Sequence, residues 1–218
     1  MGVLIDSANV TFAAGQTNSN AFNCTCGASD NRLLVLAAVW SATLTPPTVS
    51  TYNSVALTYL GSGNDGNVST VFWYYMNSPS TGAAHSVLIT FGGSISASLV
   101  VAIPISGVDL TRAPVLGVNS GDSSYSSSTD TCTTTGGGAN DLYVAGTMAG
   151  QSLTSTGSTQ SPVIANQNGI NGNVSGACAS IPGSSAGNFG WSLSAPSEWD
   201  ALGVTVYAPA NTSIGWVT

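Results

Sequence analysis

Side chains that could carry out acid–base or ionic chemistry are few in this chain. Its 218 residues include no lysine, two arginines (Arg32 and Arg112), one histidine (His85), one glutamate (Glu198) and eight aspartates, for a net charge of −7. General acid–base catalysis draws on His, Glu, Asp or Lys with adjusted pKa values, and nucleic-acid binding needs clustered Lys and Arg. The composition therefore argues against an enzyme and predicts repulsion from phosphate backbones and anionic lipid.

No residue constellation stands out as catalytic. The lone His85 has no Cys or carboxylate at ligand spacing, so we interpret it as a solvated or turn-bonded histidine and assign no serine nucleophile. Glu198 and Asp200 flank Trp199, and paired carboxylates can indicate a glycosidase. The matching segment of the internal repeat described below, around Ser96–Leu99, has no acids. We therefore predict no catalytic residues.

Two acidic loops have the composition of cation-binding segments only in part. Gly61–Asn67 alternates Asn and Asp with Gly, as calcium loops do, but lacks the bidentate carboxylate that would close the coordination shell. Asp122 and Asp130 flank a Ser-rich stretch. We interpret the first segment as a hairpin turn and the two aspartates as exposed loop charges, and we predict no metal and no cofactor.

The four cysteines leave two alternatives open. Cys24 and Cys26 are two apart on a predicted strand, so both thiols point to one face, and a bond between them would close a strained ring. A zinc site needs Cys-x2-Cys or His partners at matching spacing, which this sequence lacks. Buried free thiols and one cross-strand disulfide remain, with Cys132 and Cys178 as the other two candidates.

The apolar residues are dispersed along the chain. Hydrophobic residues make up 43% and charged residues 5%, but the longest apolar run, Leu33–Trp40, has eight residues, whereas about 20 are needed to span a bilayer. We therefore predict no membrane partner. Met1–Asp6 has neither a basic segment nor a long apolar one, so it is not a secretory signal. Synthesis in a cytoplasm is the expectation.

Strand signals alternate with Gly, Asn, Ser and Pro turns, and no helical period lasts a dozen residues. Leu33–Trp40 is apolar on both faces, which predicts one face on the core and the other beneath a loop or a neighbouring subunit. The predicted strands are Val3–Phe12, Phe22–Cys26, Leu33–Trp40, Val49–Thr51, Val55–Leu60, Ser69–Met76, Ser86–Phe91, Leu99–Ser106, Ser127–Thr134, Leu142–Met148, Thr159–Asn166, Val174–Ser180, Gly190–Ser194 and Ala201–Tyr207.

Two segments of the first half recur in the second half. Asn23–Val35 resembles Cys132–Val144, and each reads as a polar strand, a Gly-rich turn and an apolar strand. Leu88–Val101 resembles Trp191–Val204. We interpret these as the same two hairpins, repeated in the same order about one hundred residues apart.

The repeat predicts an all-β fold. We expect a two-sheet antiparallel β-sandwich, jelly-roll-like and built from two similar halves at about 20–108 and 128–208, with a tail at 209–218. Each half would leave an apolar face that pairing of the halves buries. A tandem of two small domains is the alternative. The connector Gly107–Ser127 has no long linker composition at its start, which favours one domain, 1–218.

An ordered series of short motifs is similar to a known family. The sequence resembles a β-sandwich domain that recurs in bacterial surface proteins and in structural proteins of tailed phages, over roughly residues 20–208. That resemblance implies a structural or adhesive module without catalytic residues. The motifs are Asn31–Val35, Val49–Leu57, Val71–Tyr75, Pro79–Gly82 and Ile105–Asp109, followed by Asn140–Val144 and Trp191–Val204.

Two function hypotheses from different classes follow. The first is a non-enzymatic virion structural protein, a capsid decoration or spike protein at the virion surface, which contacts itself and the major capsid or another virion protein. A trimer is expected by analogy with jelly-roll capsid proteins. The second is a glycan-binding adhesin or receptor-binding module at a cell surface, in which Gly61–Asn67 and Asn166–Gly176 donate amide hydrogen bonds to sugars. An extracellular filament subunit is a third reading.

The carboxyl-terminal tail supplies the candidate interface. Pro209 ends the strand ladder because it lacks a backbone donor, and Ile214, Trp216 and Val217 follow. Full burial of such side chains is worth roughly 1.5–3 kcal/mol each. We therefore predict that Ile214 and Trp216 pack against this domain or a neighbouring subunit, close to Met1–Ile5.

Overall fold

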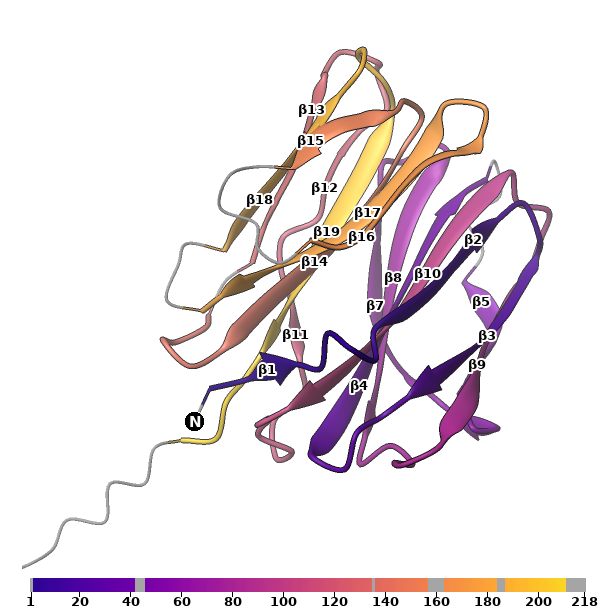
Figure 1. Cartoon of the computed structure of the whole chain (residues 1–218). Coiled ribbons are helices and arrows are strands. Elements are labelled where there is room, and N and C mark those ends of the chain that lie inside the picture. Colours follow the sequence, from indigo (N-terminus) through magenta and orange to yellow (C-terminus); the bar gives the residue numbers. More distant parts are fainter. Residues whose placement is uncertain (1, 42–45, 135, 157–162, 184–186, 211–218) are drawn as a thin grey trace, which may run out of the picture.

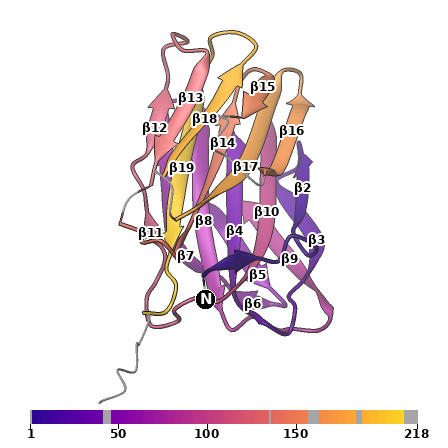
Figure 2. The ribbon, with the colours of Figure 1, turned by 60° about the vertical axis from the view of Figure 1, so that its left-hand side comes forward.

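The fold is all-β and antiparallel, as predicted. The computed structural model describes residues 2–41, 46–134, 136–156, 163–183 and 187–210, and within them every regular element is a strand. The strands form four antiparallel sheets rather than the expected two. Each half of the chain supplies one large inner sheet and one small outer sheet, and the four sheets stack in layers (Figures 1 and 2).

The strand bounds define these sheets. The first inner sheet contains β1 (Leu4–Ile5), β2 (Thr11–Gly15), β10 (Ala97–Ser106), β4 (Asp30–Trp40), β8 (Ser69–Asn77) and β7 (Thr58–Asn64). The first outer sheet contains β3 (Ser19–Thr25), β9 (Ala84–Phe91), β5 (Pro47–Tyr52) and β6 (Val55–Ala56). The second inner sheet contains β11 (Val115–Leu116), β12 (Ser120–Asp122), β19 (Trp199–Val206), β14 (Leu142–Ala149), β17 (Val174–Pro182) and β16 (Val163–Asn171). The second outer sheet contains β13 (Thr129–Thr133), β18 (Asn188–Leu193) and β15 (Leu153–Thr156).

The two halves repeat one topology. The first inner sheet has the order β1-β10-β4-β8-β7 with β2 also on β10, and the second has β11-β19-β14-β17-β16 with β12 also on β19. The outer sheets correspond in the same way, β3-β9-β5 to β13-β18-β15. The repeat therefore extends beyond the predicted limits, from β1 in the first half and from β11 in the second.

The segments interpreted as repeated hairpins are in fact crossovers between sheets. β3 lies in the outer sheet and β4 in the inner sheet, and the same holds for β13 and β14 and for the other repeated pair. A matching turn makes both of the first crossovers. The Gly27 amide donates to Asp30 Oδ2 at 2.6 Å, and the Gly138 amide donates to Asp141 Oδ2 at 2.5 Å. This turn folds the chain over the sandwich edge, so the two strands face each other through side chains.

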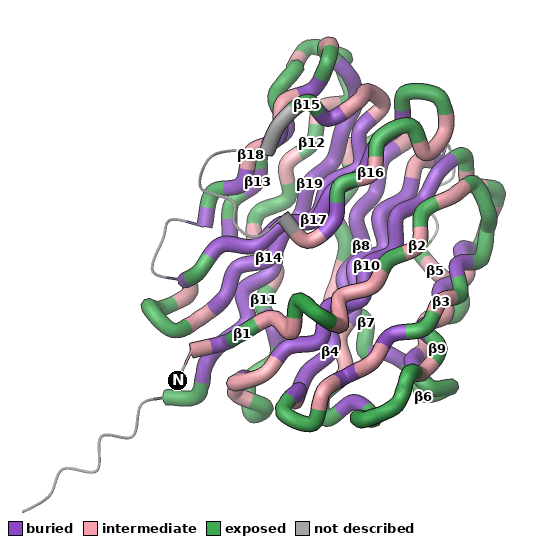
Figure 3. The backbone as a smooth tube through the Cα atoms, viewed as in Figure 1, coloured by how far each residue is buried: buried purple, intermediate pink, exposed green. Residues whose placement is uncertain are grey.

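The central core lies between the two inner sheets, where purple buried segments line the facing strands in Figure 3. It unites residues such as Leu36 and Trp73 of the first half with Val144 and Leu202 of the second, and the Trp73 indole donates to the Leu202 carbonyl at 2.9 Å. Two further cores lie between each inner sheet and its own outer sheet. Pairing of the halves thus buries an apolar face of each, as expected.

Strand β4 illustrates why two apolar faces are needed. Leu34, Leu36 and Ala38 face the central core, while Leu33 and Val35 face the first outer sheet. The predicted cover for the second face, a loop or a neighbouring subunit, is wrong because the chain's own outer sheet covers it. Trp73 and Tyr74 on β8 divide between the same two cores.

The two arginines hold the connector between the halves. The fully buried Arg32 donates from Nε to Asn77 Oδ1 at 2.8 Å and from Nη2 to the carbonyls of Asp109 and Arg112 at 3.1 and 2.8 Å. The Arg112 guanidinium lies 3.4 Å from the centre of the Tyr207 ring. The two cations therefore tie residues 109–112 to β4 and β8 of the first half and to Tyr207, which follows β19.

Gly146 permits a close approach between the inner sheets. A Cβ atom on Gly146 would lie 2.5 Å from the Leu36 side chain, which is fully buried. We predict that Gly146→Val destabilises the fold by about 1–3 kcal/mol, because overpacking a dense core forces strain. Gly15→Ala is the matched control, since nothing lies within 4 Å of its added Cβ. Urea unfolding measures both, and equal stabilities for the two variants would contradict this account of the core.

Candidate functional site at the chain ends

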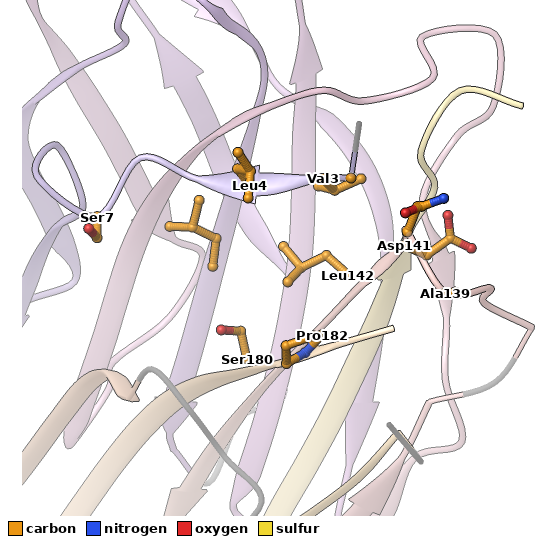
Figure 4. Close-up of a pocket in the computed structure, with 11 residues that line it drawn as sticks. Val3, Leu4, Ser7, Ala139, Asp141, Leu142, Ser180 and Pro182 are labelled. Carbon is orange, nitrogen blue, oxygen red and sulfur yellow. The ribbon is translucent and has the colours of Figure 1, made fainter. Parts of the chain in front are cut away.

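An open, largely apolar pocket lies beside the amino terminus (Figure 4). It has a volume of about 380 Å³ and lies where β1 passes over the ends of β14 and β17. Its lining residues are Gly2, Val3, Leu4, Ile5, Ser7, Ala139, Asn140, Asp141, Leu142, Ser180 and Pro182.

The amino-terminal segment bridges the two halves at this pocket. The Val3 amide donates to the Asn140 carbonyl at 2.9 Å, and Val3 joins the central core. Leu4 and Ile5 pair with the end of β10 in the first inner sheet, whereas Asn140 belongs to the second half of the chain. Since successive residues of a strand point to opposite sides, Val3 is buried and Leu4 is 56% exposed. An apolar side chain thus stays in solvent at the pocket.

The last described residues at the carboxyl-terminal side lie at the same place. The Ala208 amide donates to Asp141 Oδ1 at 2.7 Å, and Asp141 lines the pocket. In Figure 1 the N-terminal end lies beside the end of this last described segment. The predicted interface residues Ile214, Trp216 and Val217 lie outside the described residues, so their contacts stay a prediction.

The pocket can bind apolar groups but has little to offer chemistry. Asp141 is the one ionisable side chain in its lining. Both carboxylate oxygens of Asp141 already accept backbone amides, from Gly138 at 2.5 Å and from Ala208 at 2.7 Å. The site therefore has the character of a contact surface.

His85 and the cysteines are placed away from this pocket. His85 lies within β9, half-buried, with its ring edge-on to Tyr52 at 5.6 Å. All four cysteines are free and buried, so the free-thiol alternative holds and the disulfide does not. Cys24 and Cys26 face the same core, as their spacing predicted. Burial raises the pKa of Cys132 and of Cys178.

The two aspartates predicted to be exposed loop charges both lie on strands, and Asp122, at the end of β12, is half-buried. Asp122 accepts the amides of Ser124, Ser126 and Ser127 in an exposed turn. Asp130 instead is fully buried on β13, and its Oδ2 accepts the Thr147 hydroxyl. Burial raises the pKa of Asp130 well above its usual range. Asp130 lies within the predicted strand Ser127–Thr134. The prediction of an exposed charge failed because packing against β14 turns its side chain toward Thr147.

The acids flanking Trp199 both contact the first half of the chain. Glu198 Oε1 accepts the Asn67 side-chain amide, and Asp200 Oδ2 accepts the Val71 amide at 3.1 Å. Both carboxylates are buried. Burial, and the nearby Asp65 carboxylate, raise the pKa of Asp200 to about 8. Sequence reasoning missed these contacts because about 130 residues separate the partners.

A scan against protein-family models finds no match, and neither does a search of curated proteins. The resemblance to a phage and bacterial-surface β-sandwich family therefore stays a prediction.

A separate observation concerns membranes. Within the ranges that the structure describes, no helix has the length and apolar character needed to cross a bilayer.

The raised pKa of Asp200 predicts a pH-dependent stability. Its folded pKa of about 8 lies above the usual 3.8, so the folded state retains a proton that the unfolded state releases. The stability that this retained proton gives the folded state is fully present below pH 4 and is lost as the pH rises through 8. Asp200→Asn should therefore gain stability relative to the natural chain across that window, on the order of 5 kcal/mol in total.

Urea unfolding in EDTA buffer between pH 4 and pH 8.5 measures this difference. Asp122→Asn is the control, because hydrogen bonds lower the pKa of Asp122 and its titration falls below the window. A stability difference for Asp200→Asn that does not change with pH would contradict the assignment.

Proposed function

We propose that this protein is a non-enzymatic structural subunit of a virion, a capsid decoration or spike protein of a tailed phage, that acts through contacts with its own copies and with the major capsid protein. The observation that carries the proposal is the apolar pocket at the chain ends, with the exposed Leu4 beside it. An apolar recess beside both ends of the folded chain suits the exchange of a terminal segment between subunits.

The tail residues provide the complementary surface. Ile214, Trp216 and Val217 follow a few residues after Ala208, which is bonded at the pocket. Each apolar side chain that enters such a pocket contributes roughly 1.5–3 kcal/mol. We propose that the tail of one subunit fills the pocket of the next, and that the ring closes as a trimer.

The rest of the surface supports contacts through shape. With 5% charged residues and both arginines engaged internally, ion pairs offer little to an interface. The resemblance to phage structural proteins points to the same use, since that family acts without catalytic residues.

Removal of the tail tests the proposal. We expect the full chain to have three times the 21.7 kDa mass of one chain in light scattering, and a chain ending at Ala210 to be monomeric with unchanged β-sheet circular dichroism. Trp216→Ser and Leu4→Ser should each weaken assembly, because they remove opposite sides of one contact. Thr212→Ser is the matched control. A shortened chain that assembled like the full chain would refute the tail contact.

A second pocket favours the alternative of a glycan-binding module. It has a volume of about 390 Å³, and its lining includes the polar or aromatic side chains of Tyr52, Thr58, Tyr75, Asn77 and Ser80. The partly exposed Tyr75 ring, with hydroxyl and amide groups beside it, suits sugar recognition.

The loops first considered for glycans are already engaged internally. The Asn171 amide donates to the Ser96 carbonyl at 3.0 Å, and the Asn168 amide donates to the Leu153 carbonyl at 3.0 Å. The second pocket is therefore the better place for a sugar.

A glycan array checks this alternative. If it holds, the natural chain binds a consistent set of glycans, and Thr58→Val weakens that binding because it removes an exposed hydroxyl while it preserves shape. Thr129→Val, on the second outer sheet, serves as the control. An array without signal would eliminate the glycan function and leave the structural one.

A further inference from the structure

The turn between β7 and β8 holds a carboxylate that is only half satisfied. Asp65 Oδ1 accepts the amides of Asn67, Val68 and Ser69 at 2.8, 3.0 and 3.1 Å. Its other oxygen, Oδ2, is buried without a hydrogen-bond partner. This turn belongs to the Gly61–Asn67 segment whose composition is that of a calcium loop without the closing carboxylate.

The second half of the chain brings another carboxylate to the turn. Asp200 Oδ2 accepts the Val71 amide at 3.1 Å, two residues along β8 from the Ser69 amide that binds Asp65. Amides two residues apart on a strand are roughly 7 Å apart and point the same way. The Asp65 and Asp200 carboxylates therefore lie side by side along β8.

The Asp200 carboxylate, like that of Asp65, is hydrogen-bonded through only one of its two oxygens. Its side chain is fully buried, and Oδ1 has no hydrogen-bond partner. An unsatisfied buried polar atom destabilises the fold, and more so when it is charged. A cation between the two neighbouring carboxylates would satisfy the free oxygen of each, as protonation of Asp200 does at lower pH.

Glycines bring the backbones together around this pair. Gly121 lies opposite Asp200 in the β12–β19 ladder, and a Cβ on it would be 2.9 Å from Asp65 Cα. Gly63 makes room in the same way for Asn119, whose side-chain amide donates to the Asn64 carbonyl at 3.1 Å. The Asn119 amide group thus lies on the same turn as Asp65.

We propose that Asp65 and Asp200 bind one divalent cation of the calcium class, which links the two halves of the chain at the β7–β8 turn. No cluster of three or more His, Cys, Asp or Glu side chains suited to a metal occurs among the described residues. Backbone and water oxygens must therefore complete the shell.

Calcium suits these ligands better than other divalent ions. It accepts six to eight oxygens in irregular geometry, whereas magnesium demands an octahedron and loses its water reluctantly. Zinc favours Cys and His, and the nearby side chains offer oxygen. A two-carboxylate site of this kind corresponds to the weak extracellular class, with a dissociation constant of about 0.1–1 mM.

Calorimetry and thermal unfolding of the full chain test the proposal at pH 8. Titration with calcium chloride should give one site per chain, and about 10 mM calcium should raise Tm by at least 2 °C over an EDTA sample. Magnesium at the same concentration should give less than half of that rise. Asp65→Asn and Asp200→Asn should each abolish the rise in Tm that calcium causes.

The controls separate binding from folding and from general charge effects. Asp109→Asn removes the same charge from the connector, where Asp109 bonds to Thr111, and it should keep the full rise in Tm with calcium. Asp200→Asn is expected to be more stable than the natural chain in EDTA, so loss of its rise in Tm with calcium cannot arise from unfolding. Absence of calcium binding by the natural chain, or an unchanged rise in Tm in both site variants, would overturn the proposal.

Discussion

Burial of two apolar sheet faces against each other is the interaction on which the rest of this structure depends. Each inner sheet has one face toward its own outer sheet and one toward the other half, so neither half could stand alone without exposing residues such as Trp73 or Leu202. Free energy from this central core follows the apolar area removed from water. The outer sheets, the connector and both chain ends are arranged around it.

A few polar groups also contribute to the contact between the halves. Arg32 binds carbonyls of the connector, Trp73 donates across the core, and Asp200 reaches an amide of β8. Buried polar groups are tolerated where a partner satisfies them. In this chain with few charged residues, the buried ones have structural partners, but several keep one atom without a hydrogen bond. Asp65 and Asp200 stand out because two such carboxylates lie close together, which suggests a ligand.

Most strands could be predicted because their signal is local. Alternation in β9 and the continuous apolar run of β4 identify strands and their faces within a few residues. β15 was missed because Leu153–Thr156 holds one apolar residue among polar ones, and its place depends on pairing with β18. The crossovers were read as hairpins because a Gly-rich turn between two strands is compatible with both, and only sheet membership separates them.

Local pattern was enough to specify the strand content, the internal repeat, the need to pair two apolar faces and the poverty of acid–base chemistry. Long-range packing alone specified the four layers, the outward or inward direction of Asp130, the pocket beside the chain ends and the meeting of Asp65 with Asp200. The physical reason is that side-chain alternation is a property of neighbouring residues. Sheet stacking instead joins residues more than one hundred positions apart, and no local pattern encodes which partner they meet.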